Sequence, residues 1–176
     1  MKESEIMNTS THYSALAQLM HWLTVIALSI MLTLGFMMLF ADERAFKHAV
    51  EGIHVTTGFY LGLFLLIRIG FRAIAGFRQP DADEQATFKF AKWLQSLMLL
   101  TLLVVLITGP LYLFTEGEGI TLTSQTTWLI DLSSWSALHE PAEEIHKLLA
   151  TYVLPGLITL HMLAAIKQFS RLAKHR

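Results

Sequence analysis

The chain has 176 residues, a formal net charge of −1 at neutral pH, and hydrophobic side chains at 53% of its positions. It contains no cysteine, which excludes disulfide bonds and cysteine-ligated clusters and leaves histidine, methionine or carboxylates as possible metal ligands. We expect one integral membrane domain over residues 1–176, and no nucleic-acid partner.

Four apolar segments of about 22 residues each divide the chain. They comprise residues 19–40, 53–74, 93–114 and 145–166. A helix needs about 20 such residues to cross the hydrocarbon core of a bilayer. The segments take up much of the chain and leave no room for a separate soluble domain. The sequence therefore predicts an all-α fold, an integral membrane four-helix bundle surrounded by lipid.

The first two segments each begin with a histidine and contain glycines at helical spacing. His21 opens the first segment and His54 opens the second. Gly58 and Gly62 follow His54 by four and eight positions, so they share roughly its helix face. Two interpretations of these glycines are open, namely space for a flat cofactor or a close helix–helix contact. Gly35 is expected near the other end of the first segment.

Two arginines near the end of the second segment also allow two interpretations. Arg68 and Arg72 could pair with the carboxylates of a cofactor through charge-assisted hydrogen bonds. Alternatively, they extend to the lipid headgroups and anchor the helix. The greater depth of Arg68 in the span makes it the better candidate for a cofactor contact.

The fourth segment carries a histidine near each end, His146 and His161, 15 positions apart. In an α-helix this spacing separates the two imidazoles by roughly 22 Å along the axis and by about 60° in direction. Pro155 and Gly156 lie between them and could bend the helix and change that angle.

The distribution of charge in the loops predicts the orientation in the membrane. Residues 115–144 contain no Lys or Arg, whereas basic residues gather between the second and third segments and in the C-terminal tail. The basic residues are Arg78, Lys89, Lys92, Lys167, Arg171, Lys174 and Arg176. We expect both termini to be cytoplasmic, which places His21 and His161 at the inner level and His54 and His146 at the outer level.

Two facing imidazoles at each level could each hold a haem iron, giving an electron path across the membrane. A single histidine at a helix end is commonly a polar tip at the interface, but four at two matched levels favour function. The remaining histidines lie outside the spans and are expected on the solvated surface. They are His12, His48, His139 and His175.

The acidic segment 115–144 also contains Trp128, Leu129, Ile130, Leu132 and Trp135. It is typical of an interfacial aromatic belt, of a short amphipathic stretch on the outer surface, or of a docking surface for a basic periplasmic redox protein.

These residues resemble the bacterial cytochrome b561 family of di-haem membrane cytochromes. The matching features are His21-Trp22 after Tyr13-Ser14, residues 53–58 followed by Arg68 and Arg72, Thr108-Gly109, and His146 with His161. The resemblance covers residues 13 to 170. It implies two haem b groups, held by His21 with His161 and by His54 with His146. The chain has Lys92, Trp93 and Gln95 where members often carry a further histidine, and Lys167-Gln168 where many have a histidine pair.

We therefore expect single-electron transfer in the inner membrane, with the quinone pool and a redox protein as partners and no catalytic acid or base. A superoxide:quinone oxidoreductase is an alternative, which the acidic outer segment disfavours. A histidine-based metal-binding or transport protein without haem is another, formed by His48, His54, His139 and His146 with Glu51 and Glu143. A scaffold without a cofactor would leave the buried histidines unexplained.

Overall fold

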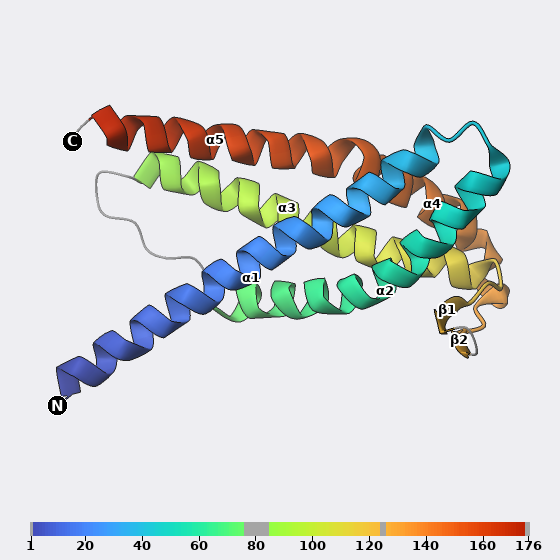
Figure 1. Ribbon diagram of the computed structural model, residues 1–176, viewed down its shortest axis with the longest axis horizontal. Helices are drawn as coiled ribbons and strands as arrows, with labels where there is room; N and C mark the ends of the chain where they lie inside the picture. Colours follow the sequence, from blue (N-terminus) through green and yellow to red (C-terminus); the bar gives the residue numbers. More distant parts are fainter. Residues whose placement is uncertain (1, 76–84, 124–125, 175–176) are drawn as a thin grey trace. The chain divides into compact units, whose positions relative to one another are not determined.

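The structure, a computed structural model, describes residues 2–75, 85–123 and 126–174 and is mostly helical (Figure 1). Of the sequence-predicted features, Arg78, His175 and Arg176 lie outside the described residues. The elements in chain order are α1 (Lys2–Leu39), α2 (Arg44–Ala75), α3 (Gln85–Thr115), β1 (Ile120–Thr123), β2 (Thr126–Trp128), η2 (Ser133–Leu138), α4 (His139–Leu148), η3 (Leu149–Val153) and α5 (Leu154–Lys174).

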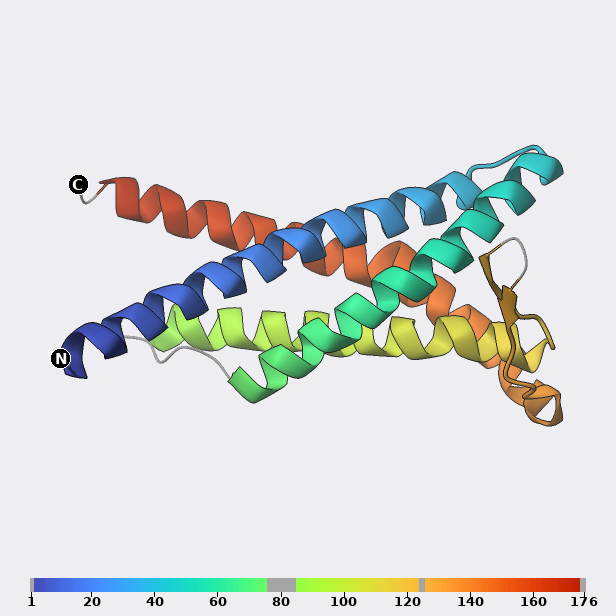
Figure 2. The same ribbon diagram turned by 60° about the horizontal axis from the view of Figure 1, so that its bottom comes forward.

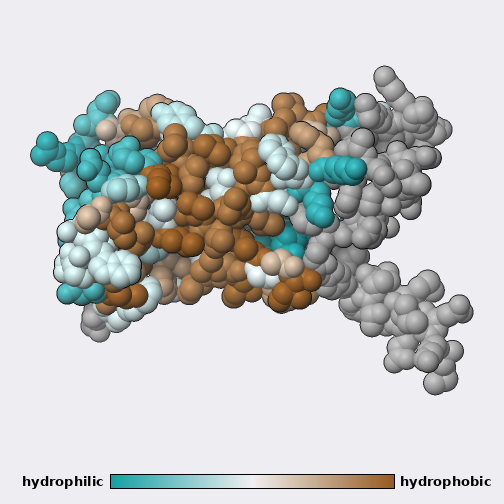
Figure 3. Space-filling model, turned by 180° about the vertical axis from the view of Figure 1, so that it is seen from behind, coloured by the Kyte–Doolittle hydropathy of each residue, from teal (hydrophilic) through white to brown (hydrophobic). Residues whose placement is uncertain are grey.

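Four helical stretches in the described residues are long and apolar enough to cross a membrane, which confirms the predicted fold class. They are Ala15–Leu39, Arg44–Ile74, Lys89–Thr115 and Ser133–Lys167. Many of their apolar side chains, such as Ile67 and Leu163, are exposed and suited to contact with lipid. Figure 3 shows hydrophobic residues, in brown, gathered over the middle of the face that it draws.

The second span begins earlier than predicted. The second apolar segment was expected to begin at residue 53, but α2 already begins at Arg44. The ion pair between His48 Nδ1 and Glu51 Oε2, 3.3 Å apart at i,i+3 spacing, lies within this added part of the helix. Only residues 40–43 separate α1 from α2.

The chain forms two compact units, Met1–Arg68 and Ile69–Arg176. The first consists of α1 and most of α2, with Ala27, Val50 and Leu65 among its buried side chains. The second contains the end of α2 and everything that follows. The single membrane domain over residues 1–176 stays a prediction.

In the second unit, α3 packs against α4 and α5, and Leu94, Leu102 and Leu154 are buried. Two buried threonines on α3, Thr108 and Thr115, are satisfied within the helix itself. The Oγ1 of Thr108 donates to the carbonyl of Val104 at 2.8 Å. Such back-bonding allows hydroxyl groups in a span where no water can pair with them.

The α3 helix ends in a Schellman motif at Gly117. The N–H of Gly117 donates to the Phe114 carbonyl at 3.2 Å, and the N–H of Glu118 donates to the Leu113 carbonyl at 3.1 Å. Gly117 has a φ of +84°, the left-handed conformation that this cap requires and that glycine adopts without steric cost.

A two-stranded antiparallel hairpin, β1–β2, follows this cap (Figure 2). Ile120 pairs with Trp128, and the register shifts between Thr121 and Thr123. The Trp128 ring packs edge-on against Phe114 of α3 at 5.5 Å between centroids. The predicted amphipathic stretch around Trp128 and Trp135 is therefore no single helix, because β2 ends at Trp128 and η2 begins at Ser133.

Candidate functional site

The imidazole of His146, on α4, lies directly against the backbone of α3 at Gly109. A Cβ atom on Gly109 would lie 2.9 Å from Cε1 and 3.2 Å from Nδ1 of His146. Real Cβ atoms essentially never approach as closely as the first distance. The missing side chain of Gly109 therefore provides the space in which the His146 ring lies.

A hydrogen bond fixes the tautomer of this ring. Nδ1 of His146 lies 3.1 Å from the carbonyl oxygen of Val105 on α3. Because a carbonyl oxygen only accepts, the proton of the neutral ring is on Nδ1, and Nε2 keeps its lone pair. Metal-ligating histidines characteristically donate their other ring N–H to a backbone carbonyl or a carboxylate. His146 is therefore held in the state that a metal ligand needs.

Tyr112, three positions after Gly109 on α3, contacts two histidines of α4. Its ring centroid lies 5.9 Å from that of His146 and 6.0 Å from that of His139. Tyr112 thus connects the predicted iron ligand to a histidine that we had expected on the solvated surface.

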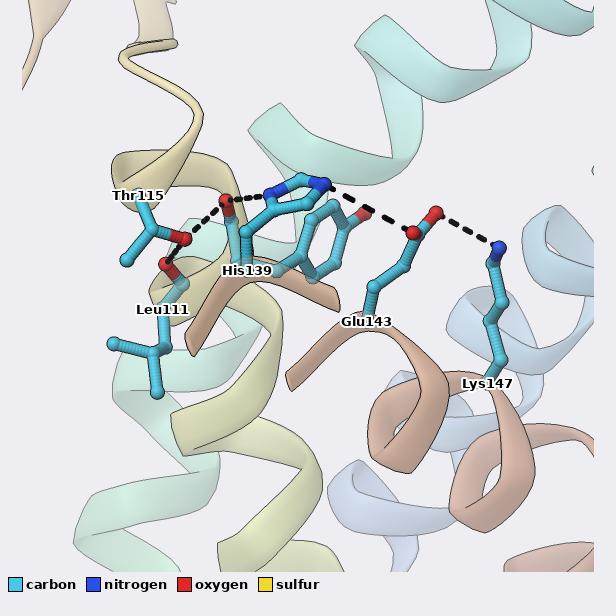
Figure 4. A network of polar contacts seen from close by, with 6 residues as sticks. Leu111, Thr115, His139, Glu143 and Lys147 are labelled. Carbon is cyan, nitrogen blue, oxygen red and sulfur yellow. Dashed lines mark hydrogen bonds and ion pairs between the residues drawn. The ribbon is translucent and has the colours of Figure 1, made fainter. Parts of the chain in front are cut away.

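His139 is part of a polar network at the end of α3 (Figure 4). Its Nδ1 lies 3.0 Å from the carbonyl oxygen of Tyr112, and its Nε2 lies 3.9 Å from Oε2 of Glu143. Lys147 Nζ lies 2.7 Å from the other oxygen of Glu143. The side chain of His139 is 29% exposed, whereas that of His48 is 71% exposed. The surface interpretation thus holds for His48 but describes His139 incompletely.

Between His146 and His161 the helix contains a π turn, η3, immediately before Pro155. The N–H of Leu154 donates to the carbonyl of Leu149, five positions back. Such a turn accommodates about one extra residue, so it changes the angle between the two histidines from about 60° to about 40° in the opposite sense. Both histidines still point to the same half of the helix. His161 is half-buried.

In the first unit, His54 lies beside α1. A Cβ atom on Gly35 would lie 4.0 Å from Cε1 of His54, an ordinary contact distance, so Gly35 sits at the level expected for it. A Cβ atom on Gly58 would lie 3.0 Å from Cε of Met31. Gly58 therefore allows a close approach of α1, which favours the helix-contact interpretation of this glycine. Gly62 is buried.

His21 is exposed on α1, with its ring 5.8 Å from that of Trp22. Arg68 is half-buried. Nη2 of Arg72 donates to Oε1 of Gln95 on α3 at 3.0 Å, a partner that the sequence interpretation did not consider. In each predicted ligand pair, one histidine belongs to the unit Met1–Arg68 and the other to the unit Ile69–Arg176. The pairing of His21 with His161 and of His54 with His146 therefore stays a prediction.

The alternative histidine-based metal site takes its residues from both units and stays an alternative, since groups of possible metal ligands can be assessed only in the part of the chain that the structure describes. There, no three His, Cys, Asp or Glu side chains form a group that could hold a metal ion.

Comparison with protein families identifies the chain. The sequence model described as prokaryotic cytochrome b561 matches residues 12–174. The chain belongs to the prokaryotic cytochrome b561 family. Comparison with curated proteins and with solved structures gave no match.

Membership in the cytochrome b561 family confirms the resemblance drawn from the histidines. It makes the protein a multi-pass bacterial membrane protein that binds haem b and transfers electrons. The Nδ1 bond of His146 and the space over Gly109 fit a haem ligand of this kind.

Proposed function

We propose that the protein carries single electrons across the bacterial inner membrane through two haem b groups. His21 with His161 would hold the inner haem, and His54 with His146 the outer one. The observation that carries this proposal is the geometry of His146, whose Nδ1 lies against the Val105 carbonyl, so that the lone pair an iron ligand needs is on Nε2.

Haem supplies one-electron chemistry at its iron. Two histidine ligands leave no open coordination position, so such a centre transfers electrons and does not bind oxygen. The protein's own residues orient the ligands and set their surroundings: Gly109 provides space, Val105 fixes the tautomer, and the π turn directs His161. Arg68 is the candidate for pairing with a haem carboxylate, and Gly62 for packing against the haem plane.

Quinone is the proposed partner within the bilayer, and a basic periplasmic redox protein the proposed partner outside. The outer partner is supported by the exposed Glu116, Glu118 and Asp131 near the hairpin, together with the exposed rings of Trp128 and Trp135. These carboxylates would attract a cation and repel an anion, which speaks against superoxide as the substrate. The proposed topology has both termini in the cytoplasm.

The test is the haem content per chain of protein purified in mild detergent, with its reduced-minus-oxidised spectrum. We expect two b-type haems per chain, and His21→Ala and His54→Ala should each lose one. His48→Ala, which removes an exposed histidine of α2, should keep both. A colourless protein with stoichiometric bound metal would contradict the proposal and support the metal-binding alternative.

A further inference from the structure

The network of His139, Glu143 and Lys147 is a group of ionisable side chains for which electron transfer by itself has no need (Figure 4). It lies where α4 meets the end of α3, at the start of the fourth span. The side chains of His139 and Glu143 are each about one-third exposed, so water and protons reach them. It is also close in sequence to the predicted outer iron ligand, His146.

The hydrogen bonds determine where His139 can take up a proton. The Tyr112 carbonyl only accepts, so the neutral ring of His139 carries its proton on Nδ1. Nε2 then faces the Glu143 carboxylate 3.9 Å away. A proton that binds there forms an ion pair with a carboxylate already in position. Imidazole is the side chain that ordinarily gains and loses a proton between pH 5 and 8.

Within the described residues, the ionisable side chains of this network come from α4 and α3. Glu143 faces the ring from α4 itself, Tyr112 faces it from α3, and Lys147 pairs with the other oxygen of Glu143. The η2 segment that precedes α4 has the sequence Ser-Ser-Trp-Ser-Ala-Leu and carries no ionisable side chain. Protonation of Nε2 therefore changes the charge of this network from zero to plus one, with Glu143 ionised and Lys147 protonated.

We propose that His139 takes up a proton from the outer aqueous phase when the outer haem gains an electron, which makes that haem's potential depend on pH. This inference rests on the proposed function. His146 lies seven positions after His139, about 10 Å further along α4. An iron held by His146 and a proton on His139 would therefore interact electrostatically, with the interaction partly screened by water. The proposed step would thus take up one electron at the haem and one proton from solvent at Nε2 of His139.

The sign follows from the charges. An added electron makes the haem more negative and favours the protonated form of His139. Protonation of His139 in turn favours reduction, since linkage between two sites is reciprocal. The outer midpoint potential is therefore higher when His139 is protonated, and it falls as the pH rises.

The experiment is a spectroelectrochemical titration of the haem-loaded protein at several pH values between 5 and 8. We expect one of the two midpoint potentials to fall with rising pH, and His139→Gln to make it constant. His48→Gln is the matched control: His48 also pairs with a glutamate and lies six positions from a predicted ligand, but it is 71% exposed and screened by water. That variant should keep the pH dependence.

A second variant, Glu143→Gln, leaves His139 in place and removes the partner of its protonated form. The pH range over which the potential changes should then move to lower pH. Potentials that do not vary with pH in the unaltered protein, or a dependence that survives His139→Gln, would overturn the inference and leave the haem assignment intact. A protein without haem would instead overturn the proposed function, and this inference with it.

Discussion

A side chain on Gly109 would collide with His146, since its Cβ atom would lie 2.9 Å from Cε1 of that ring. The neighbouring atom belongs to an imidazole that is itself bonded to the Val105 carbonyl, so the ring cannot move away without breaking that bond. One glycine on α3 thus determines where a predicted iron ligand on α4 can lie.

The first prediction concerns this glycine. Gly109→Ala should displace the His146 ring and reduce the haem content from two to one per chain, at a cost of about 1–3 kcal/mol in packing. Haem extraction and the visible spectrum measure the loss. Gly70→Ala is the control, because no atom lies within 4 Å of a Cβ built there, and both haems should remain.

The π turn before Pro155 leads to a second prediction. If η3 accommodates one extra residue, deletion of Ala150 should convert it to regular α-helix and leave the relative direction of His146 and His161 nearly unchanged. Insertion of one alanine at the same place should instead rotate His161 by about 100°.

The haem spectrum distinguishes the two variants. The deletion variant should retain both haems, whereas the insertion variant should lose the inner one. Loss of the inner haem on deletion, with retention on insertion, would contradict this role of the π turn.

Much of the helical fold could be predicted because length and hydropathy determine which segments can span a membrane. The start of α2 was predicted too late, since residues 44–52 are too polar to count as part of an apolar run. They still form helix, where His48 can pair with Glu51. The β1–β2 hairpin was missed although residues 120–123 and 126–128 are rich in threonine, a strand-favouring residue.

The site was less predictable from sequence. The apolar segments and the family resemblance pointed to His146, but nothing local indicates that its Nδ1 meets the Val105 carbonyl, 41 positions away. The same holds for His139, whose partner Tyr112 is 27 positions distant. Both contacts depend on how α4 packs against α3. The family resemblance included the Thr108-Gly109 pair, but the role of Gly109 follows only from the position of the His146 ring beside it.

A third prediction concerns the hydrogen bond from Arg72 to Gln95, which connects the end of α2 to α3. Both residues are half-buried, and hydrogen bonds to charged groups contribute about 1.5–3 kcal/mol. A double-mutant cycle with Arg72→Leu and Gln95→Leu, measured by thermal unfolding in detergent, should give a coupling free energy near the lower end of that range. Purely additive losses would show that the bond contributes nothing.

A fourth prediction addresses the outer partner. If Glu116 and Glu118 attract a basic redox protein, the rate of electron exchange with a cationic soluble cytochrome should fall steeply as the salt concentration rises. Replacing both glutamates by glutamine should lower the rate at low salt and flatten this dependence. The conservative control, replacement of both by aspartate, should preserve it. A rate that does not respond to salt would instead favour the interfacial aromatic belt.

The last prediction concerns Asp131, which precedes η2 and lies outside the candidate spans. Its Oδ1 accepts hydrogen bonds from the Ser133 hydroxyl at 2.6 Å and from the Ser133 N–H at 3.0 Å. These bonds hold the pKa of the Asp131 carboxyl below its usual value of 3.8. The stabilisation of this turn is therefore fully present above pH 3.8 and is lost as the pH falls through the lowered pKa.

Trp135, four residues further on, provides the measurement. Its fluorescence should stay constant from pH 7 to about pH 4 and change only below that, as Asp131 becomes protonated. The effect should be small, because Asp131 is fully exposed and solvent screens its charge. Asp131→Asn keeps an acceptor oxygen without a charge, so its fluorescence should lose this acid transition. A transition that persists unchanged in that variant would assign it to another carboxylate of the outer segment.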